Sequence, residues 1–260
     1  MKSLRLLAGY VRHNLMVGMA YRKAFFLQVF GMMLNNFMLL FFWSLLFRQF
    51  PTLNGWEMQG VILIYAVVAL GYGIAHTVFG NSGQLARIVA TGDLDYYLAL
   101  PADPLVHLLV SRMSLPALGD LIFALLLYLI SVPHALLRLP LFLLLGGLTA
   151  LLFVAFDVLV GSLVFWMGQA ENLALQLRNA LLTFALYPVD IFPGIVRLFL
   201  YTLIPAALVG SVPAKLVLDF DPLHLLGLLA VVVGALLLAR RVFARGLHRY
   251  ESGNLVTTRG

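Results

Sequence analysis

Residues 86–104 read ARIVATGDLDYYLALPADP, an acidic and aromatic stretch set between two long apolar runs. We expect a short helix over 84–90, which Gly92 ends in a left-handed conformation because glycine lacks a Cβ. A second helical turn over 94–100 follows, with Asp93 as its N-terminal cap. The stretch therefore predicts a short, rigid helical elbow rather than a flexible linker.

Two prolines close this elbow, since Pro101 and Pro104 are expected to stop the second turn before the next apolar run. One side of the turn carries Leu94, Tyr97 and Leu98, while Asp93, Asp95 and Tyr96 point elsewhere. Tyrosine rings with acidic neighbours are typical of contact surfaces between proteins. Two interpretations remain open for the elbow, a docking surface for a soluble partner and an ordinary polar loop.

The composition of the chain indicates a membrane protein. Hydrophobic residues make up 62% and charged residues 11%, and the mean hydropathy is +0.99. Soluble domains carry about 25% charged residues, so this chain needs lipid as its solvent. It has no cysteine, which excludes disulfides and thiolate metal sites. The net charge of +6 comes from residues at the ends of apolar runs, which favours membrane orientation over nucleic-acid binding.

The apolar runs predict an all-α membrane protein, with residues 1–260 forming one membrane domain. A helix rises about 1.5 Å per residue, and a bilayer core is about 30 Å thick. Before the first run, Leu4, Leu7, Val11 and Leu15 recur at helical spacing, which predicts an N-terminal amphipathic helix in the membrane interface. Six spans are predicted, at about 25–47, 60–79, 115–132, 141–167, 172–190 and 223–239.

The fifth span has two interpretations because Pro188, Pro193 and Pro205 interrupt the apolar sequence around it. In the preferred one, the span ends near Pro188 and a re-entrant or interfacial hairpin over 192–216 follows on the outer side. In the alternative, the span covers 194–212 and the segment 173–187 lies on the cytoplasmic surface.

Positive charge predicts the orientation of the chain. Most of the 17 Lys and Arg residues fall on one side if the N-terminus is cytoplasmic. That bias requires an even number of crossings, so both termini and the elbow are expected in the cytoplasm.

Polar side chains inside predicted spans are functional candidates, because they are costly in lipid. Here they are Asp120, Asp157, Arg178 and Asn179. We favour an ion pair between one of the aspartates and Arg178 over a proton or cation site. His76 is placed near the outer end of the second span, where it has no metal ligand beside it and is assigned to helix packing.

Three segments carry a resemblance to a known family. They are TGDLDYYLALPADP at 91–104, YPVDIFP at 187–193 and IPAALVGSVP at 204–213. Together they resemble the permease subunits of ABC type-2, export-type transport systems, and most closely a bacterial subgroup of paired permeases related to viologen and drug exporters. The most specific element is the pattern G-x-L-D-x-x-L-x-x-P, formed by Gly92, Leu94, Asp95, Leu98 and Pro101.

The resemblance implies that the elbow over 84–101 is a cytoplasmic coupling helix, docked in a cleft of a separate ATPase subunit. The residues that it assigns to ATPase coupling are Gln84, Arg87, Gly92, Asp93, Leu94, Asp95, Tyr96, Tyr97, Leu98 and Pro101. It also implies a second permease subunit, either a related chain or an identical one, and the bacterial inner membrane as the location.

The sequence predicts no enzymatic activity for the chain itself. A Walker A motif needs a lysine in G-x-x-x-x-G-K-[ST], and Lys2, Lys23 and Lys215 all lack that context. No catalytic residue, cofactor or metal is expected, so ATP hydrolysis falls to the partner. The alternative function is a proton-coupled secondary transporter that uses Asp120 and Asp157.

Overall fold

The computed structural model describes residues 9–10, 14, 16, 22–101 and 103–250. Within these ranges all regular secondary structure is helical, apart from one isolated bridge between Leu53 and Trp56. The predicted N-terminal amphipathic helix lies largely outside the described residues.

Four helices are long and apolar enough to cross a membrane. They are α2 (Arg22–Gln49), α3 (Met58–Val78), α8 (Ala135–Gly161), which continues into α9 (Val164–Met167), and α14 (Pro222–Leu247). These helices coincide with the first, second, fourth and sixth predicted spans.

The third and fifth predicted spans coincide with shorter helices, α7 (Ala117–Ser131) and α10 (Glu171–Ala185). Each has 15 residues, which corresponds to about 22 Å and is less than the thickness of a bilayer core. The described helices therefore give four crossings by length and composition, or five with a bent pair. The count of six remains a prediction.

The bent pair lies between α10 and α14. It joins α11 (Gly194–Thr202) to the segment Ala206–Leu218, which contains α12 (Ala206–Val209) and α13 (Ser211–Leu218), with a bend of 63° between its halves. A proline stands directly before each half of the pair, Pro193 before α11 and Pro205 before α12. The fixed φ of proline suits the start of a helix, and its missing N–H prevents the preceding helix from continuing. By geometry the pair is either a broken span or a re-entrant loop.

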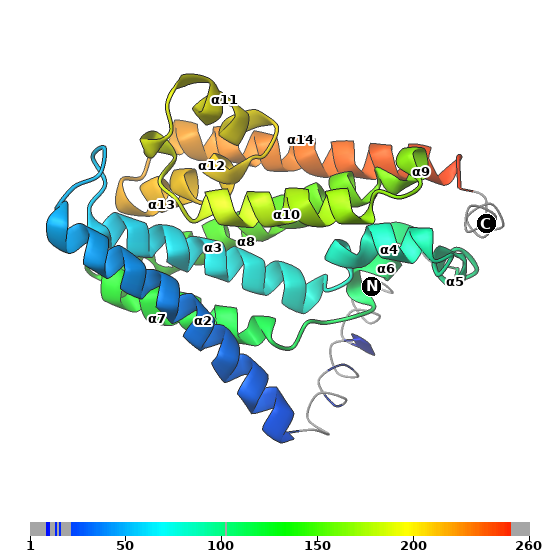
Figure 1. Ribbon diagram of the computed structural model, residues 1–260, viewed down its shortest axis with the longest axis horizontal. Coiled ribbons are helices and arrows are strands. Elements are labelled where there is room, and N and C mark those ends of the chain that lie inside the picture. Colours follow the sequence, from blue (N-terminus) through cyan, green and yellow to red (C-terminus); the bar gives the residue numbers. More distant parts are fainter. Residues whose placement is uncertain (1–8, 11–13, 15, 17–21, 102, 251–260) are drawn as a thin grey trace.

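The centre of the bundle is α3, which packs against α7 on one side and α8 on the other (Figure 1). Glycines allow α3 and α8 to approach closely. A Cβ on Gly71 would lie 2.2 Å from Cγ2 of Thr149, and one on Gly146 would lie 2.2 Å from Cδ2 of Leu70. A methyl group at either position would push the two helices apart.

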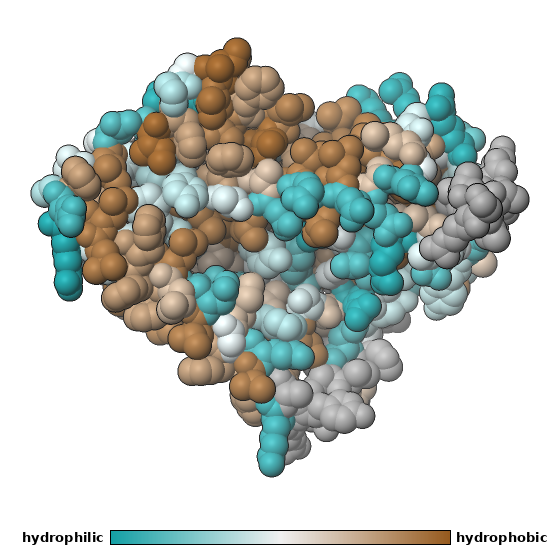
Figure 2. Space-filling view, viewed as in Figure 1, coloured by the Kyte–Doolittle hydropathy of each residue, from teal (hydrophilic) through white to brown (hydrophobic). Residues whose placement is uncertain are grey.

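The outer helices show what surrounds the bundle. In the most apolar window of α3, 72% of the residues are buried, against 11% for α2 and 17% for α14. Both α2 and α14 therefore present apolar side chains outward, as lipid-facing or subunit-facing helices do. Figure 2 shows hydrophobic surface on both flanks of the face that it draws, over α2 on one flank and over α11 and part of α14 on the other.

Candidate functional site

The predicted elbow is a chain of short helices at one end of the bundle, between α3 and α7 (Figure 1). Its elements are η1 (Ser82–Gln84), α4 (Leu85–Ala90), α5 (Leu94–Leu98) and α6 (Pro104–Val110). Gly92 has a φ of +81° and separates α4 from α5, as the sequence predicted.

Two predicted details of the elbow are wrong. Asp93 does not cap α5, because its backbone is helical and its Oδ2 accepts a hydrogen bond from Thr91 Oγ1 at 2.7 Å. Pro104 does not stop a helix but begins α6, where its fixed φ suits the first turn. The side chain that does cap a helix here is Asp103, whose Oδ1 accepts from the backbone N–H of Val106 at 3.1 Å.

The elbow has a buried side and an exposed side. Leu85 and Leu94 are fully buried and Tyr97 is half-buried, which fixes the elbow on the bundle. Leu98 was predicted to share that side, but it is 42% exposed. The exposed residues among those assigned to ATPase coupling, called the elbow rim below, are Gln84, Arg87, Asp93, Asp95, Tyr96, Leu98 and Pro101.

Polar contacts fasten α5 and α6 to the start of the elbow. The side-chain amide of Asn81 donates to the carbonyl of Leu108 at 3.1 Å and to Ser111 Oγ at 2.8 Å. The hydroxyl of Tyr97 lies 3.0 Å from the same Ser111 Oγ, and its ring packs edge-on against His107. The segment returning from the elbow is thus fixed at several points.

The last turns of α14 and the residues directly after it also contact the elbow. Arg240 forms an ion pair with Asp103 at 3.2 Å, and Tyr250 donates to the carbonyl of Gly92 at 3.3 Å. Burial raises the pKa of Tyr250 to about 12, with further contributions from a hydrogen bond to Asp95 and from the charges of Asp95 and Asp93. The hydroxyl group therefore stays protonated and available as a donor at neutral pH.

A buried charge cluster, formed by His76, Ser82, Asp157 and Arg178, lies where the elbow meets the bundle. Asp157 on α8 is only 3% exposed and accepts from Arg178 Nε on α10 at 2.8 Å. Its other oxygen accepts from Ser82 Oγ in η1 at 2.7 Å. The predicted pairing of a span aspartate with Arg178 is thus present, and Asp157 is the partner.

Arg178 uses the rest of its guanidinium to reach two further elements. Its Nη1 donates to the carbonyl of Gly83 at 3.0 Å, and its Nη2 lies 3.1 Å from Nε2 of His76. Because a guanidinium can only donate, Nε2 of His76 accepts, and Nδ1 donates to the carbonyl of Tyr72 at 3.1 Å. The cluster therefore joins α3, α8 and α10 to the start of the elbow.

The predicted placement of His76 at the outer end of its span conflicts with the predicted cytoplasmic position of the elbow. His76 lies in the last turn of α3, directly before the elbow, and is 7% exposed. Its contacts could not be predicted from the neighbouring sequence, because Asp157 and Arg178 are far from it along the chain. Only packing of three helices brings them together.

The other two intramembrane candidates lie apart from the cluster. Asp120 on α7 is 2% exposed and accepts from Asn36 Nδ2 on α2 at 2.6 Å. Its second oxygen has no hydrogen-bond partner among the described residues. The bond ties α2 to α7, and the interpretation that pairs Asp120 with Arg178 is wrong.

Asn179 belongs to an exposed polar stripe on α10. Side chains four, three and four residues apart lie on one face of a helix. The stripe consists of Asn172, Gln176, Asn179 and Thr183, all exposed. Figure 2 shows hydrophilic surface along the middle of the drawn face, where Figure 1 places α10, between hydrophobic flanks.

A second polar cluster lies at the opposite end of the bundle from the elbow. Asp190 in η2 (Val189–Ile191) accepts from Lys215 at 2.7 Å and from the indole N–H of Trp56 at 2.9 Å. Arg197 lies 3.7 Å from its other oxygen. Burial raises the pKa of Asp190, but hydrogen bonds from Lys215 and Trp56 and the charges of Lys215 and Arg197 bring it below its usual value.

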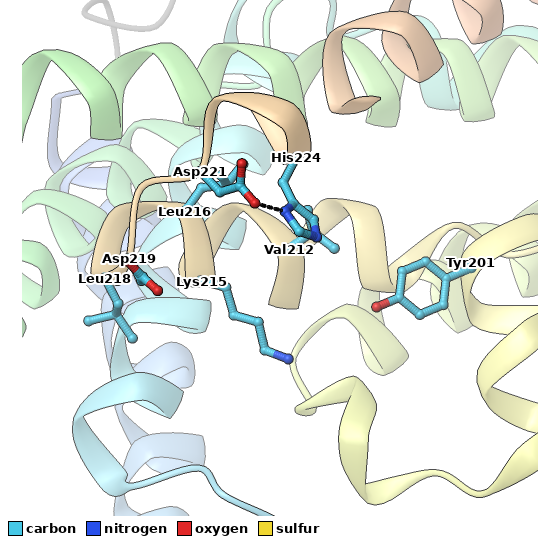
Figure 3. A pocket seen from close by; sticks show the side chains of 8 residues that line it. All are labelled: Tyr201, Val212, Lys215, Leu216, Leu218, Asp219, Asp221 and His224. Atoms are coloured by element: carbon cyan, nitrogen blue, oxygen red, sulfur yellow. Dashed lines mark hydrogen bonds and ion pairs between the residues drawn. The ribbon is translucent and has the colours of Figure 1, made fainter. Parts of the chain in front are cut away.

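Two cavities adjoin this second cluster. One, of about 420 Å³, has Lys215, Asp219, Asp221 and His224 around it and Tyr201 across from them (Figure 3). His224 hydrogen-bonds to Asp221. The other, of about 620 Å³, shares Lys215 and is walled by residues of the α2–α3 loop. Among the described residues, no group of three or more His, Asp or Glu could hold a metal ion.

Comparison with protein families identifies the family of the chain. A family model described as "ABC-2 family transporter protein" matches residues 33–254. The chain belongs to the ABC-2 transporter family. The match spans the elbow, the buried charge cluster and the polar stripe on α10. Comparison of the ABC-2 chain with curated proteins and with solved structures gives no match. Membership makes the chain a membrane permease and implies partnership with an ABC ATPase.

Proposed function

We propose that the chain is the membrane-spanning subunit of an ATP-driven exporter in the bacterial inner membrane, with both termini cytoplasmic. Its elbow rim docks against a separate ATPase subunit. The observation that carries this proposal is the buried charge cluster, which bonds the start of the elbow to α3, α8 and α10. The elbow exposes its rim on one side and is bonded to several helices on the other. It can therefore transfer a movement of the ATPase to the membrane helices.

The cluster supports a specific mechanical step. Ser82 and Gly83 in the elbow bond to Asp157 and Arg178, which lie on two different helices. A displacement of η1 by the ATPase would therefore shift α8 and α10 together rather than bend the elbow alone. Rigid-body movement of this kind can open a path alternately to the two sides of the membrane.

The same contacts disfavour proton coupling through Asp157. Its carboxylate is engaged by a guanidinium and a hydroxyl, so protonation would break a buried ion pair. Of the two aspartates in that alternative, only Asp120 has an oxygen without a partner among the described residues.

The polar stripe on α10 supports a water-filled path. Four polar side chains facing lipid would lose their hydrogen bonds with water, at a cost of about 1–3 kcal/mol each. We place this stripe on a path formed with a second permease subunit, related or identical. Since α10 packs along α8 and α3, it serves as the fifth span, and the bent pair 194–218 serves as a re-entrant hairpin on the outer side.

Single cysteines test the docking and the orientation together, because the chain has no cysteine of its own. Tyr96→Cys and Leu98→Cys lie on the elbow rim, and Thr52→Cys lies in the loop between α2 and α3 as a control. We expect rim cysteines to cross-link to a co-purified ATPase and to react with a membrane-impermeant maleimide only after cells are opened.

The control cysteine has the opposite expectation. Thr52→Cys should react with the same reagent in intact cells and should form no cross-link with the ATPase. Labelling of rim cysteines in intact cells, or transport by the purified chain without an ATPase, would refute the proposal.

A further inference from the structure

A basic cavity of about 630 Å³ lies between the start of α2, the elbow and the segment that joins α6 to α7. Its polar lining consists of Gln28, Gln84, Arg87, Arg112 and Ser114. None of the described residues that line it is acidic. Two guanidinium groups with amide and hydroxyl neighbours form a donor set that matches the oxygens of a phosphate group.

The surroundings of the cavity indicate which kind of molecule carries such a phosphate group. Gln28 stands on the first turns of α2, and its neighbours Phe26, Leu27 and Phe30 are exposed large apolar side chains. An amphiphile with its phosphate against Arg112 could therefore lay its acyl chains along α2. A soluble anion would gain nothing from this apolar surface.

We infer that this cavity binds the phosphate headgroup of an anionic membrane lipid, in the leaflet next to the elbow. Basic pockets between spans are suited to such headgroups. The bound lipid bridges α2 and the elbow. Gln84 and Arg87 line the cavity and also belong to the elbow rim. The test of the inference therefore uses the chain alone, without an ATPase.

The test uses the full chain in phosphatidylcholine nanodiscs that contain a trace of spin-labelled phosphatidylglycerol, and it measures the immobilised fraction of the label. Arg112→Gln should weaken retention about five- to tenfold, and Gln28→Leu should weaken it measurably. The matched control is Arg245→Gln, because Arg245 is also an exposed arginine at the elbow end of the molecule but lies on α14.

Three results would overturn the inference. The first is retention by both cavity variants that equals that of the wild type. The second is an equal loss in Arg245→Gln and Arg112→Gln, which would show general surface attraction. The third is displacement of the label by millimolar inorganic phosphate, which would assign the cavity to a soluble anion. Gln28→Leu keeps the test valid if Arg112→Gln fails to fold, since Gln28 is exposed and its loss removes no buried contact.

Discussion

A Cβ atom added to Gly83 would lie 2.2 Å from the guanidinium carbon of Arg178. The two residues are therefore in contact at the point where the elbow meets α10, and only glycine leaves room for the arginine. Gly83→Ala is expected to displace Arg178 from Asp157 and to destabilise the chain by about 1–3 kcal/mol, the usual cost of overpacking a core. Thermal unfolding in detergent measures this effect.

The control for that variant is Gly147→Ala. Gly147 lies within α8, and a Cβ there would meet no atom within 4 Å. Alanine is the better helix former, so the control should unfold at the wild-type temperature or slightly above it. Equal unfolding temperatures for the two variants would refute the assigned contact.

The ion pair between Asp157 and Arg178 is expected to serve assembly rather than substrate choice. Asp157→Asn or Arg178→Gln leaves one buried charge unpaired and should cost about 3–5 kcal/mol. The double variant should recover part of that loss, because it leaves no lone charge. Fluorescence-detected size exclusion of all three variants measures the yield of folded protein. A changed substrate profile at unchanged yield would contradict this role.

Gly92 is expected to control the angle between α4 and α5. Its φ of +81° costs other residues about 1–2 kcal/mol, so Gly92→Ala should destabilise the elbow and reduce cross-linking from Tyr96→Cys to the ATPase. Asparagine tolerates left-handed backbone better than alanine does. Gly92→Asn should therefore retain more cross-linking than Gly92→Ala, and the reverse order would argue against a backbone effect.

The cluster around Asp190 should make stability depend on pH. The folded chain holds the pKa of Asp190 below its usual value, so the contribution is complete above an unfolded pKa of about 4. It is lost as the pH falls through the lower folded value. Asp190→Asn should reduce stability at pH 7 and flatten the acid limb of the unfolding curve, whereas Asp219→Asn, an exposed neighbour, should leave that limb unchanged.

Much of the fold follows from local sequence. The apolar runs predicted the positions of the long helices, and glycine at position 92 predicted the left-handed turn, because both depend on nearby residues. The cap at Asp93 failed for a local reason too, since the hydroxyl of Thr91 competes for the same carboxylate. One neighbouring residue, Thr91, was therefore enough to change the hydrogen-bond partner of Asp93.

The site was harder to predict because its residues meet only through packing. The sequence offered two aspartates as partners for Arg178, and nothing in their spacing selected Asp157. The contacts of His76 and Ser82 were missed, since each comes from a different element. The polar stripe could have been predicted, because its residues already show helical spacing in the sequence. They are Asn172, Gln176, Asn179 and Thr183.

The shared contacts of Ser82 and Gly83 also constrain protein engineering. A chimera whose elbow carries other residues at these two positions would still keep the host's Asp157 and Arg178. Unless the matching positions on α8 and α10 are exchanged as well, the donor segment would dock on a bundle that cannot hold it. A segment exchanged between permeases should therefore include the contacting positions within α8 and α10, and not only the loop that carries the elbow.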